Sequence, residues 1–364
     1  AGELSAKYLT TNLEVTLKLR SDIMLAAARN FQPDLLLVDK KPYGLRDELK
    51  TTIRYLKTTR PQTRCVLLLR DILDSPANTM KEWQTHGYHD AIARYYDQIL
   101  VVGMPEVFDL RREYALPPEI AARVVFCGYI RKAPGDRKPT QVRQELGVAA
   151  SEKLVLVTPG GGEDGYCLVA AYLDGLKHSQ RCKNQPDKSQ PYKTLIITGS
   201  EMPGEQRQRV LAEAQAFPNV QVLEFTHDPM SYIAAADLVV CMGGYNTMTE
   251  VLSQAKRAIT VPRMKPGQEQ LIRAERMQAM GMLSMIHPQT LTPDGLITAV
   301  EQELQVSSPV LAVTRLDLNA LPQVAQQISN LLFQSVSGRA IATYVPNVSD
   351  LNLATVQMLT KELN

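Results

Sequence analysis

The stretch DLVVCMGGYNTMTEVLSQA, residues 237–255, shows on a small scale how this chain is built. Residues 237–242 are mostly apolar and typical of a buried strand, and the run from 246 onward suits a helix. Between them stand Gly243 and Gly244. Glycine lets a backbone turn sharply and approach a ligand closely, and the first N–H groups of a helix can bind an anion. We therefore interpret the stretch as a strand–turn–helix unit with a ligand at its turn.

The same alternation runs along most of the chain. Apolar runs separated by amphipathic segments favour right-handed crossovers and parallel sheets. Helical patterns include residues 12–29, 45–57, 79–95, 246–254 and 269–280. The predicted fold class is α/β with two doubly wound, Rossmann-like domains. Its strands are expected at 34–39, 64–69, 98–103, 123–128, 153–158, 194–199, 220–225, 237–242 and 258–262.

A segment rich in Pro, Gly and cations, YIRKAPGDRKPT at 129–140, interrupts the pattern and indicates a linker. We predict an N-terminal domain at 1–131, a C-terminal domain at 132–318, and a helix and tail at 319–364 that returns to the N-terminal domain. The first domain opens on a helical pattern, whereas a doubly wound domain usually opens on a strand. We therefore expect it to lack its N-terminal strands, and the natural chain to extend upstream of Ala1.

The composition excludes several classes of protein. Of the 364 residues, 45% are hydrophobic and 21% charged, which predicts a globular fold, and the net charge of +2 gives no reason to expect a nucleic-acid partner. No apolar run is long enough to span a bilayer, and no signal peptide is recognisable, so we expect a cytoplasmic protein and leave peripheral membrane contact open. The five cysteines are widely spaced without a CxxC, which argues against disulfides and zinc.

Ligands of an open parallel sheet bind beyond the carboxyl ends of its strands, so the residues after each strand are the most informative. One such group is TPGGGEDG, residues 158–165. Gly160, Gly161 and Gly162 can bring backbone N–H groups to a phosphate, and a plain tight turn is the alternative. The string fits GxGxxG, but the next strand ends without the acid that a dinucleotide site requires. Glu163 and Asp164 oppose a purely anionic site.

A second group is the glycine turn of the opening stretch. Asn246 and Thr247 can cap the following helix or bind a ligand oxygen. Glu250 follows Thr247 by three residues, which fits a capping box as well as a ligand contact. Both interpretations stay open from the residues alone.

Two further groups follow strands in the second domain. In VPRMKPGQEQ, residues 261–270, Glu269 and Gln270 can hydrogen-bond sugar hydroxyls, or they can simply form a solvated helix start. In EFTHDP, residues 224–229, the backbone near Phe225 can contact the edge of a base. No cluster suits a metal, and no GxSxG occurs. In the first domain Asp39 and Asp71 end strands and are the candidate catalytic residues, with a cap or an ion pair as the alternative.

Taken in order, these groups resemble the glycosyltransferases of the GT-B fold. The nearest branch resembles family 28 in its C-terminal domain and contains the UDP-GlcNAc transferase of peptidoglycan lipid synthesis. A group of predicted bacterial glycosyltransferases is similar over most of the chain. The matching pieces are FQPDLLLVDK, LLLRDIL, GGGEDG, FTHDPMSYIAAADLVVCMGGYNTMTEVL and VPRMKPGQEQLIRAERMQAMG.

The resemblance implies a donor site in the second domain and acceptor binding by the first. Glycine turns and the helix N-terminus would receive the diphosphate of a nucleotide-sugar donor, with a UDP-sugar favoured. Glu250 would hold the ribose, the acid–amide pair Glu269 and Gln270 the sugar, and the backbone near Phe225 the base. The implied reaction is inverting sugar transfer to an unknown acceptor, with no metal or other cofactor.

The family's N-terminal GxGH loop has no counterpart here, so its catalytic histidine is not matched and we expect a fragment of a longer enzyme. A nucleotide-sugar epimerase of the same fold is one alternative function. A non-catalytic nucleotide-sugar-binding protein is the other.

Overall fold

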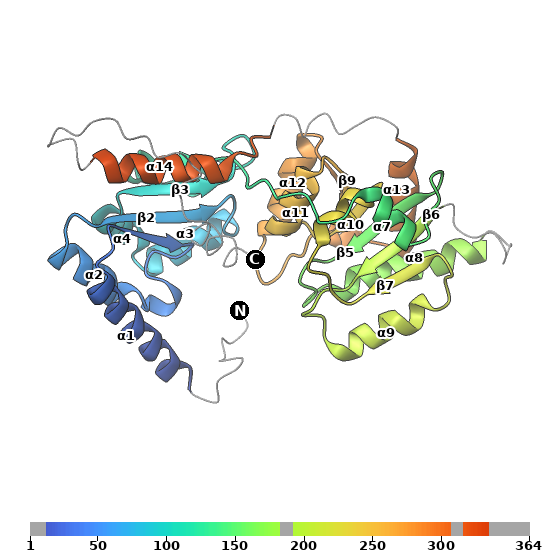
Figure 1. Cartoon of the computed structure of the whole chain (residues 1–364), viewed down its shortest axis with the longest axis horizontal. Coiled ribbons are helices and arrows are strands. Elements are labelled where there is room, and N and C mark those ends of the chain that lie inside the picture. The colour runs from blue at the N-terminus through green and yellow to red at the C-terminus, as the bar shows by residue number, and fades with distance from the viewer. Residues whose placement is uncertain (1–11, 183–191, 307–315, 335–364) are drawn as a thin grey trace. The chain divides into compact units, whose positions relative to one another are not determined.

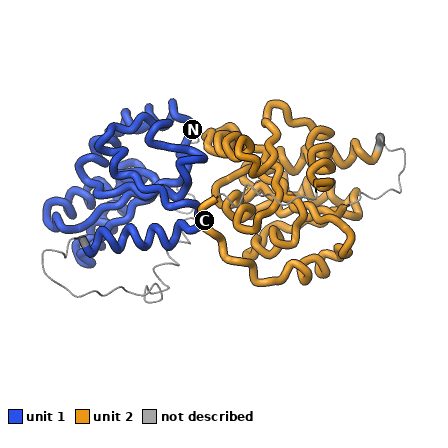
Figure 2. Tube along the Cα trace, turned by 90° about the horizontal axis from the view of Figure 1, so that it is seen from above, with its two compact units in different colours: residues 1–129, 319–364 blue, residues 130–318 orange. Residues whose placement is uncertain are grey.

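The computed structural model describes residues 12–182, 192–306 and 316–334. The chain divides into two compact units, one formed by 1–129 with 319–364 and the other by 130–318 (Figure 2). Each contains one parallel sheet whose strands alternate with helices (Figure 1), so the predicted α/β fold class is confirmed.

The sheet of unit 1 has the order β1-β2-β3-β4, and its strands are all parallel. These strands are β1 (Leu35–Asp39), β2 (Arg64–Arg70), β3 (Gln98–Val102) and β4 (Val124–Phe126). The helices are α1 (Leu13–Phe31), α2 (Lys50–Thr59), α3 (Pro76–Thr85), α4 (Tyr88–Tyr95), α5 (Leu110–Glu113), α6 (Pro118–Ala121) and α14 (Ala320–Gln334), with a 3-10 turn at Leu45–Asp47.

The single helix predicted at 79–95 is wrong, because α3 and α4 are separate helices. Gly87 between them has a left-handed conformation with φ of 61°, which glycine adopts without strain. The chain therefore changes direction at Gly87, although the helical pattern of the sequence continues across it.

One helix of unit 1 keeps an apolar stripe in solvent. On α1 the side chains of Val15, Leu19 and Ile23 are each more than half exposed. Their spacing of four residues places them on one face. Ala28 is the only buried residue described in α1, which packs on α2. Within the described part of unit 1, this face of α1 is accessible surface.

Unit 2 has a sheet of order β10-β9-β8-β5-β6-β7, again entirely parallel. The strands are β5 (Lys153–Thr158), β6 (Tyr192–Ile197), β7 (Val220–Leu223), β8 (Leu238–Cys241), β9 (Arg257–Thr260) and β10 (Ser284–Met285). The helices are α7 (Pro139–Glu145), α8 (Tyr166–Cys182), α9 (Gly204–Ala214), α10 (Pro229–Ala235), α11 (Tyr245–Ser253), α12 (Glu269–Ala279) and α13 (Pro293–Gln305), with a 3-10 turn at Pro288–Thr290.

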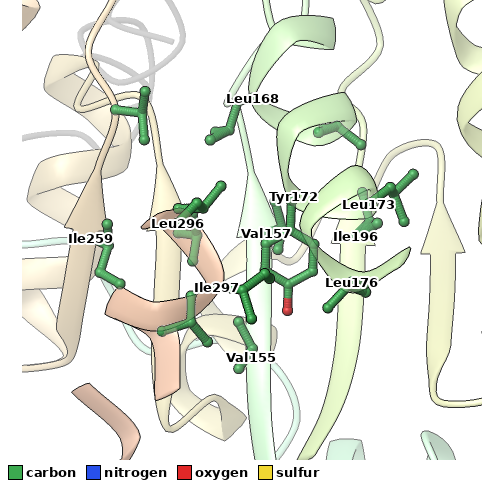
Figure 3. Packing of buried hydrophobic residues seen from close by; sticks show 14 of the residues in the cluster. Val155, Val157, Leu168, Tyr172, Leu173, Leu176, Ile196, Ile259, Leu296 and Ile297 are labelled. Atoms are coloured by element: carbon green, nitrogen blue, oxygen red, sulfur yellow. The ribbon is translucent and has the colours of Figure 1, made fainter. Parts of the chain in front are cut away.

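The core of unit 2 lies where α8 and α13 pack together against the central strands (Figure 3). Tyr172 of α8 and Ile297 of α13 are buried there against Val155 and Val157 of β5. The Tyr172 hydroxyl forms a hydrogen bond of 2.8 Å with the Thr194 hydroxyl, so the polar end of this buried side chain has a partner. This packing fixes α8, and with it the loop that joins β5 to α8.

The close contact of α8 with α13 depends on Gly175. A Cβ at this position would lie 2.6 Å from Cγ1 of Ile297 and closer still to the Pro293 carbonyl oxygen. Gly175→Ala would gain about 1 kcal/mol of helix propensity, but overpacking a rigid core costs about 1–3 kcal/mol. We therefore expect Gly175→Ala to destabilise unit 2, although helix propensity alone favours alanine over glycine.

The measurement is urea unfolding of the whole chain followed by circular dichroism. The single tryptophan, Trp83, lies in unit 1, and its fluorescence gives an internal reference for that unit. Gly204→Ala is the matched control, because a Cβ at Gly204 meets no atom within 4 Å. Equal stability of the two variants would contradict the packing argument.

Candidate donor-binding site

Two strands that are distant in sequence lie side by side at the centre of unit 2. After β5 the chain builds β6 and β7 on one side, then returns to build β8, β9 and β10 on the other. Thr158 at the end of β5 pairs with Cys241 at the end of β8. This boundary is a topological switch point, where loops diverge from the carboxyl ends of two neighbouring strands. Both predicted glycine turns begin at this point.

The glycine turn after β5 is partly a requirement of the fold. Gly160 and Gly162 have φ of 86° and 97°, a region that side chains rarely adopt. A Cβ on Gly162 would also overlap the Thr198 carbonyl oxygen. Gly161 is different, because its φ is ordinary and an added Cβ would meet only Cγ of Glu201 at 4.0 Å. Of the three glycines in this turn, Gly161 is therefore the one at which the fold itself would accept a side chain.

The turn after β8 starts helix α11 earlier than the sequence suggested. Gly244, in extended conformation with φ −59° and ψ 149°, is the N-cap, and as a glycine it has no side chain that could cap the helix. The capping box between Thr247 and Glu250 is therefore wrong, since Thr247 is the third residue inside the helix and Asn246 the second. A helix start without a side-chain cap suits a bound anion.

The two turns approach each other closely. A Cβ built on Gly160 would lie 3.2 Å from the Thr247 hydroxyl oxygen. The structure thus brings together Gly160, Gly161, Gly162, Gly243, Gly244, Asn246 and Thr247, the residues predicted for the diphosphate.

Glu250 is the sixth residue of α11 and is partly buried. Its carboxylate accepts no hydrogen bond from the part of the chain that the structure describes. Burial raises the pKa of Glu250, and the charge of Lys132 opposes this rise. A carboxylate removed from water without hydrogen-bond donors costs free energy in the empty protein, and a ligand that supplies hydroxyl donors would recover it.

The acid–amide pair opens helix α12, beside α11. Gln270 is buried, and its Oε1 accepts a hydrogen bond of 3.2 Å from the Arg263 backbone N–H. A Cβ on Gly244 would lie 3.7 Å from Nε2 of Gln270, so the donor end of this amide faces the start of α11. The Glu269 carboxylate lies 2.9 Å from the Arg263 guanidinium. Glu269 and Gln270 therefore join the same end of the sheet as the glycine turns.

The sequence reasoning missed two arginines. Arg273, one turn after Gln270, is 1% exposed and donates to the Gly243 carbonyl oxygen at 3.0 Å. Its guanidinium also lies over the Tyr245 ring, 5.7 Å from the centroid. Through its bond to the Gly243 carbonyl oxygen, this buried cation holds the glycine turn after β8 in place. The only signal for Arg273 in the sequence was its position, as a charged residue on the same face of α12 as Gln270. Arg263 is the second missed residue.

Phe225 follows β7, two strands away from β5 in the sheet. Its side chain is 49% exposed. The Phe225 and His227 rings meet edge to face, with their centroids 4.7 Å apart. Phe225 lies at the carboxyl end of the same sheet as the two turns.

The two candidate catalytic residues belong to unit 1. Asp39 is exposed at the end of β1. Asp71 is 1% exposed, and its carboxylate accepts hydrogen bonds from the Tyr129 hydroxyl at 3.1 Å and the Ile72 backbone N–H at 2.8 Å. These contacts hold Asp71 in the interior of unit 1.

Within the described ranges, no group of three or more His, Cys, Asp or Glu side chains is arranged to hold a metal ion. None of the helices described is both long and apolar enough to cross a membrane.

Comparison with other proteins places these observations in context. Residues 175–328 match the glycosyltransferase family 28 C-terminal domain, which confirms the resemblance drawn from the motifs. An uncharacterized glycosyltransferase of Methanopyrus kandleri is 26% identical over 220 residues, which are 60% of this chain and 57% of that protein. The UDP-N-acetylglucosamine–N-acetylmuramyl-(pentapeptide) pyrophosphoryl-undecaprenol N-acetylglucosamine transferase of Vibrio cholerae is 30% identical over 141 residues, which are 38% of this chain and 37% of that enzyme. The chain thus spans little more than half of the first relative and less of the second.

Solved structures share the fold at low identity. MurG of Acinetobacter baumannii superposes with a TM-score of 0.56 at 17% identity, over 88% of this chain and 82% of that one. A putative UDP-N-acetylglucosamine 2-epimerase of Listeria monocytogenes superposes with a TM-score of 0.61 at 9% identity, over 94% and 85%. Transferases and epimerases therefore share this architecture.

The partly buried carboxylate of Glu250 gives a test of the site. Glu250→Gln keeps the shape of the side chain and removes its charge. Charge-assisted hydrogen bonds contribute about 1.5–3 kcal/mol each, so UDP affinity should fall about tenfold or more. Because the folded protein raises the pKa of Glu250, the charge costs stability above its unfolded pKa, and the melting temperature of Glu250→Gln at neutral pH should stay equal or rise.

The same shift fixes the sign of the pH dependence. Wild-type affinity for UDP should weaken as pH falls through the raised pKa of Glu250, and this step should be missing in Glu250→Gln. Calorimetry measures both, with the exposed Glu205→Gln on α9 as control. Unchanged affinity in Glu250→Gln would remove this residue from the site.

The glycine turns give a second test. Gly161→Ala and Gly244→Ala add a methyl group where the backbone accepts it without strain. If a diphosphate approaches both turns, each variant should lose about tenfold or more in UDP affinity while remaining folded. Gly204→Ala should bind like the wild type. Wild-type affinity in either turn variant would mean that this turn is only structural.

Proposed function

We propose that this chain is part of a glycosyltransferase that transfers a sugar from a UDP-sugar to an acceptor hydroxyl, with inversion and without a required metal. The observation that carries the proposal is the convergence of two glycine turns at one switch point, with a helix that starts at a glycine N-cap and carries the partly buried Glu250. The match to family 28 supports the reaction class. The Vibrio cholerae relative, named for its UDP-N-acetylglucosamine substrate, supports the nucleotide.

The family resemblance assigns the proposed contacts, and the geometry of unit 2 supports those at the switch point. The diphosphate would bind backbone N–H groups at Gly161, Gly244 and the start of α11, where the helix dipole favours negative charge. Glu250 would accept hydrogen bonds from the ribose hydroxyls. Glu269 and Gln270 would contact the sugar, and the backbone near Phe225 the base.

The reaction needs stabilisation of the leaving group more than it needs a nucleophile from the protein. The acceptor oxygen forms a bond to the anomeric carbon, the bond from that carbon to the phosphate oxygen breaks, and UDP leaves with the electron pair. The acceptor proton goes to a general base. Preorganised N–H groups and the helix dipole would stabilise the negative charge that develops on UDP, the role a metal has in other enzymes.

A cytoplasmic, bacterial origin and an acceptor bound by unit 1 belong to the same proposal. Among the described residues, Cys65, Cys127, Cys167 and Cys241 form no disulfide. The epimerase alternative rests on the shared fold.

Calorimetry and product analysis test the proposal together. The wild-type chain should bind UDP and UDP-N-acetylglucosamine more tightly than GDP, and EDTA should leave these affinities unchanged. Incubation with UDP-N-acetylglucosamine and analysis by NMR then separates the reactions. Release of UDP with an unchanged sugar configuration at C2 supports transfer to water or acceptor, whereas a C2 epimer supports the epimerase. Binding without any product by the full-length protein favours a nucleotide-sugar-binding protein, and absence of UDP binding by this chain rejects the proposal.

A further inference from the structure

Arg263 connects two loops at the switch point of unit 2. It follows β9, and its guanidinium lies 3.0 Å from the Asp164 carboxylate and 2.9 Å from that of Glu269. Its backbone N–H donates to Oε1 of Gln270 at 3.2 Å. Asp164 belongs to the glycine turn after β5, 99 residues away in sequence. One residue thus holds the β5 turn and the start of α12 together.

The charges around this arginine pose a physical problem. Glu163 and Asp164 follow the glycines directly, and Glu250 and Glu269 lie at the same end of the sheet. A diphosphate brought to these glycines would be repelled by uncompensated carboxylates in a partly desolvated site. Arg263 compensates two of the four with one guanidinium, and the buried Arg273 adds a second positive charge behind Gly243.

The contacts of Arg263 are those of a charge-compensating group. Burial by itself would lower the pKa of Arg263, but hydrogen bonds to Asp164 and Glu269 outweigh burial and raise it. Its Nε is buried and has no acceptor among the described residues. Two carboxylates, rather than a complete hydrogen-bond network, therefore hold the guanidinium in place.

Arg263 also sets the orientation of Gln270. Because the Arg263 backbone N–H occupies Oε1, the Nε2 end of the amide faces Gly244 at the start of α11. A donor is thereby presented to the place where an anionic or hydroxyl-rich ligand would lie. The side chain of Arg263 balances charge, and its backbone orients the amide.

We propose that Arg263 is a positioning residue of the donor site, which neutralises Asp164 and Glu269 so that a diphosphate can approach the glycine turns. This inference rests on the proposed function and adds to it the way an acidic loop becomes compatible with an anionic ligand. It predicts an effect that depends on the charge of the ligand, which a merely structural clamp between loops would not produce.

The test compares UDP with uridine, the same nucleoside without phosphates, by calorimetry and ligand-observed NMR on the whole chain. Arg263→Met should lose about tenfold or more in UDP affinity, because the released carboxylates repel the diphosphate, and should lose much less for uridine. Asp164→Asn added to Arg263→Met should recover part of the UDP affinity, because it removes one of the two released charges and leaves that of Glu269. Arg209→Met on α9 removes an exposed charge elsewhere in unit 2 and should bind like the wild type.

The outcomes separate the two ideas. Equal losses for UDP and uridine, or no recovery with Asp164→Asn, would show a structural clamp and overturn the inference while leaving the proposed function standing. Wild-type UDP affinity in Arg263→Met would overturn it as well. If the wild-type chain itself does not bind UDP, the proposed function and this inference fail together. Hydrogen exchange at the starts of α8 and α12 shows whether each variant keeps the fold of the two loops.

Discussion

The pairing of β5 with β8 is the constraint on which the candidate site depends. These strands are separated by two complete strand–helix units in sequence, yet they are neighbours in the sheet of unit 2. Because both run in the same direction, their following turns emerge at the same edge. Gly160 then lies against Thr247, so the two glycine turns meet. Without this pairing, each glycine turn would be an ordinary loop.

The side chains around these turns combine opposing electrostatic demands. Under the proposed function, a diphosphate would need positive potential, whereas ribose and sugar hydroxyls would need acceptors such as Glu250 and Glu269. Unit 2 meets the first demand with the helix start at α11 and the buried Arg273, both directed at the turn after β8. It supplies the carboxylates at the periphery and binds one of them, Glu269, to Arg263. Positive and negative groups therefore lie at different positions in unit 2, and these positions matter more than the net charge of the unit.

The comparisons show why the site, and not the fold, must carry the functional argument. A transferase and an epimerase superpose on this chain about equally well, at 17% and 9% identity. The common architecture supplies strand ends and helix starts on which sites for different reactions can be built. What distinguishes reactions is the chemistry placed on those strand ends, which is why the match over residues 175–328 has more weight than the superposition.

The sequence by itself determined the alternation of strands and helices and the positions of the glycine turns, because apolar periodicity and glycine act over a few neighbouring residues. It also placed Glu250, Glu269 and Gln270 after strands of one domain. Only the tertiary structure decided what these residues contact. The helix start at Gly244 replaced the predicted capping box, because Gly244 takes the N-cap position and leaves Thr247 inside the helix. The roles of Arg263 and Arg273 depend on contacts with Asp164 and Gly243, which the strand order brings close from distant parts of the chain. Local patterns record which element a residue belongs to, whereas an ion pair between loops exists only after the sheet has assembled them.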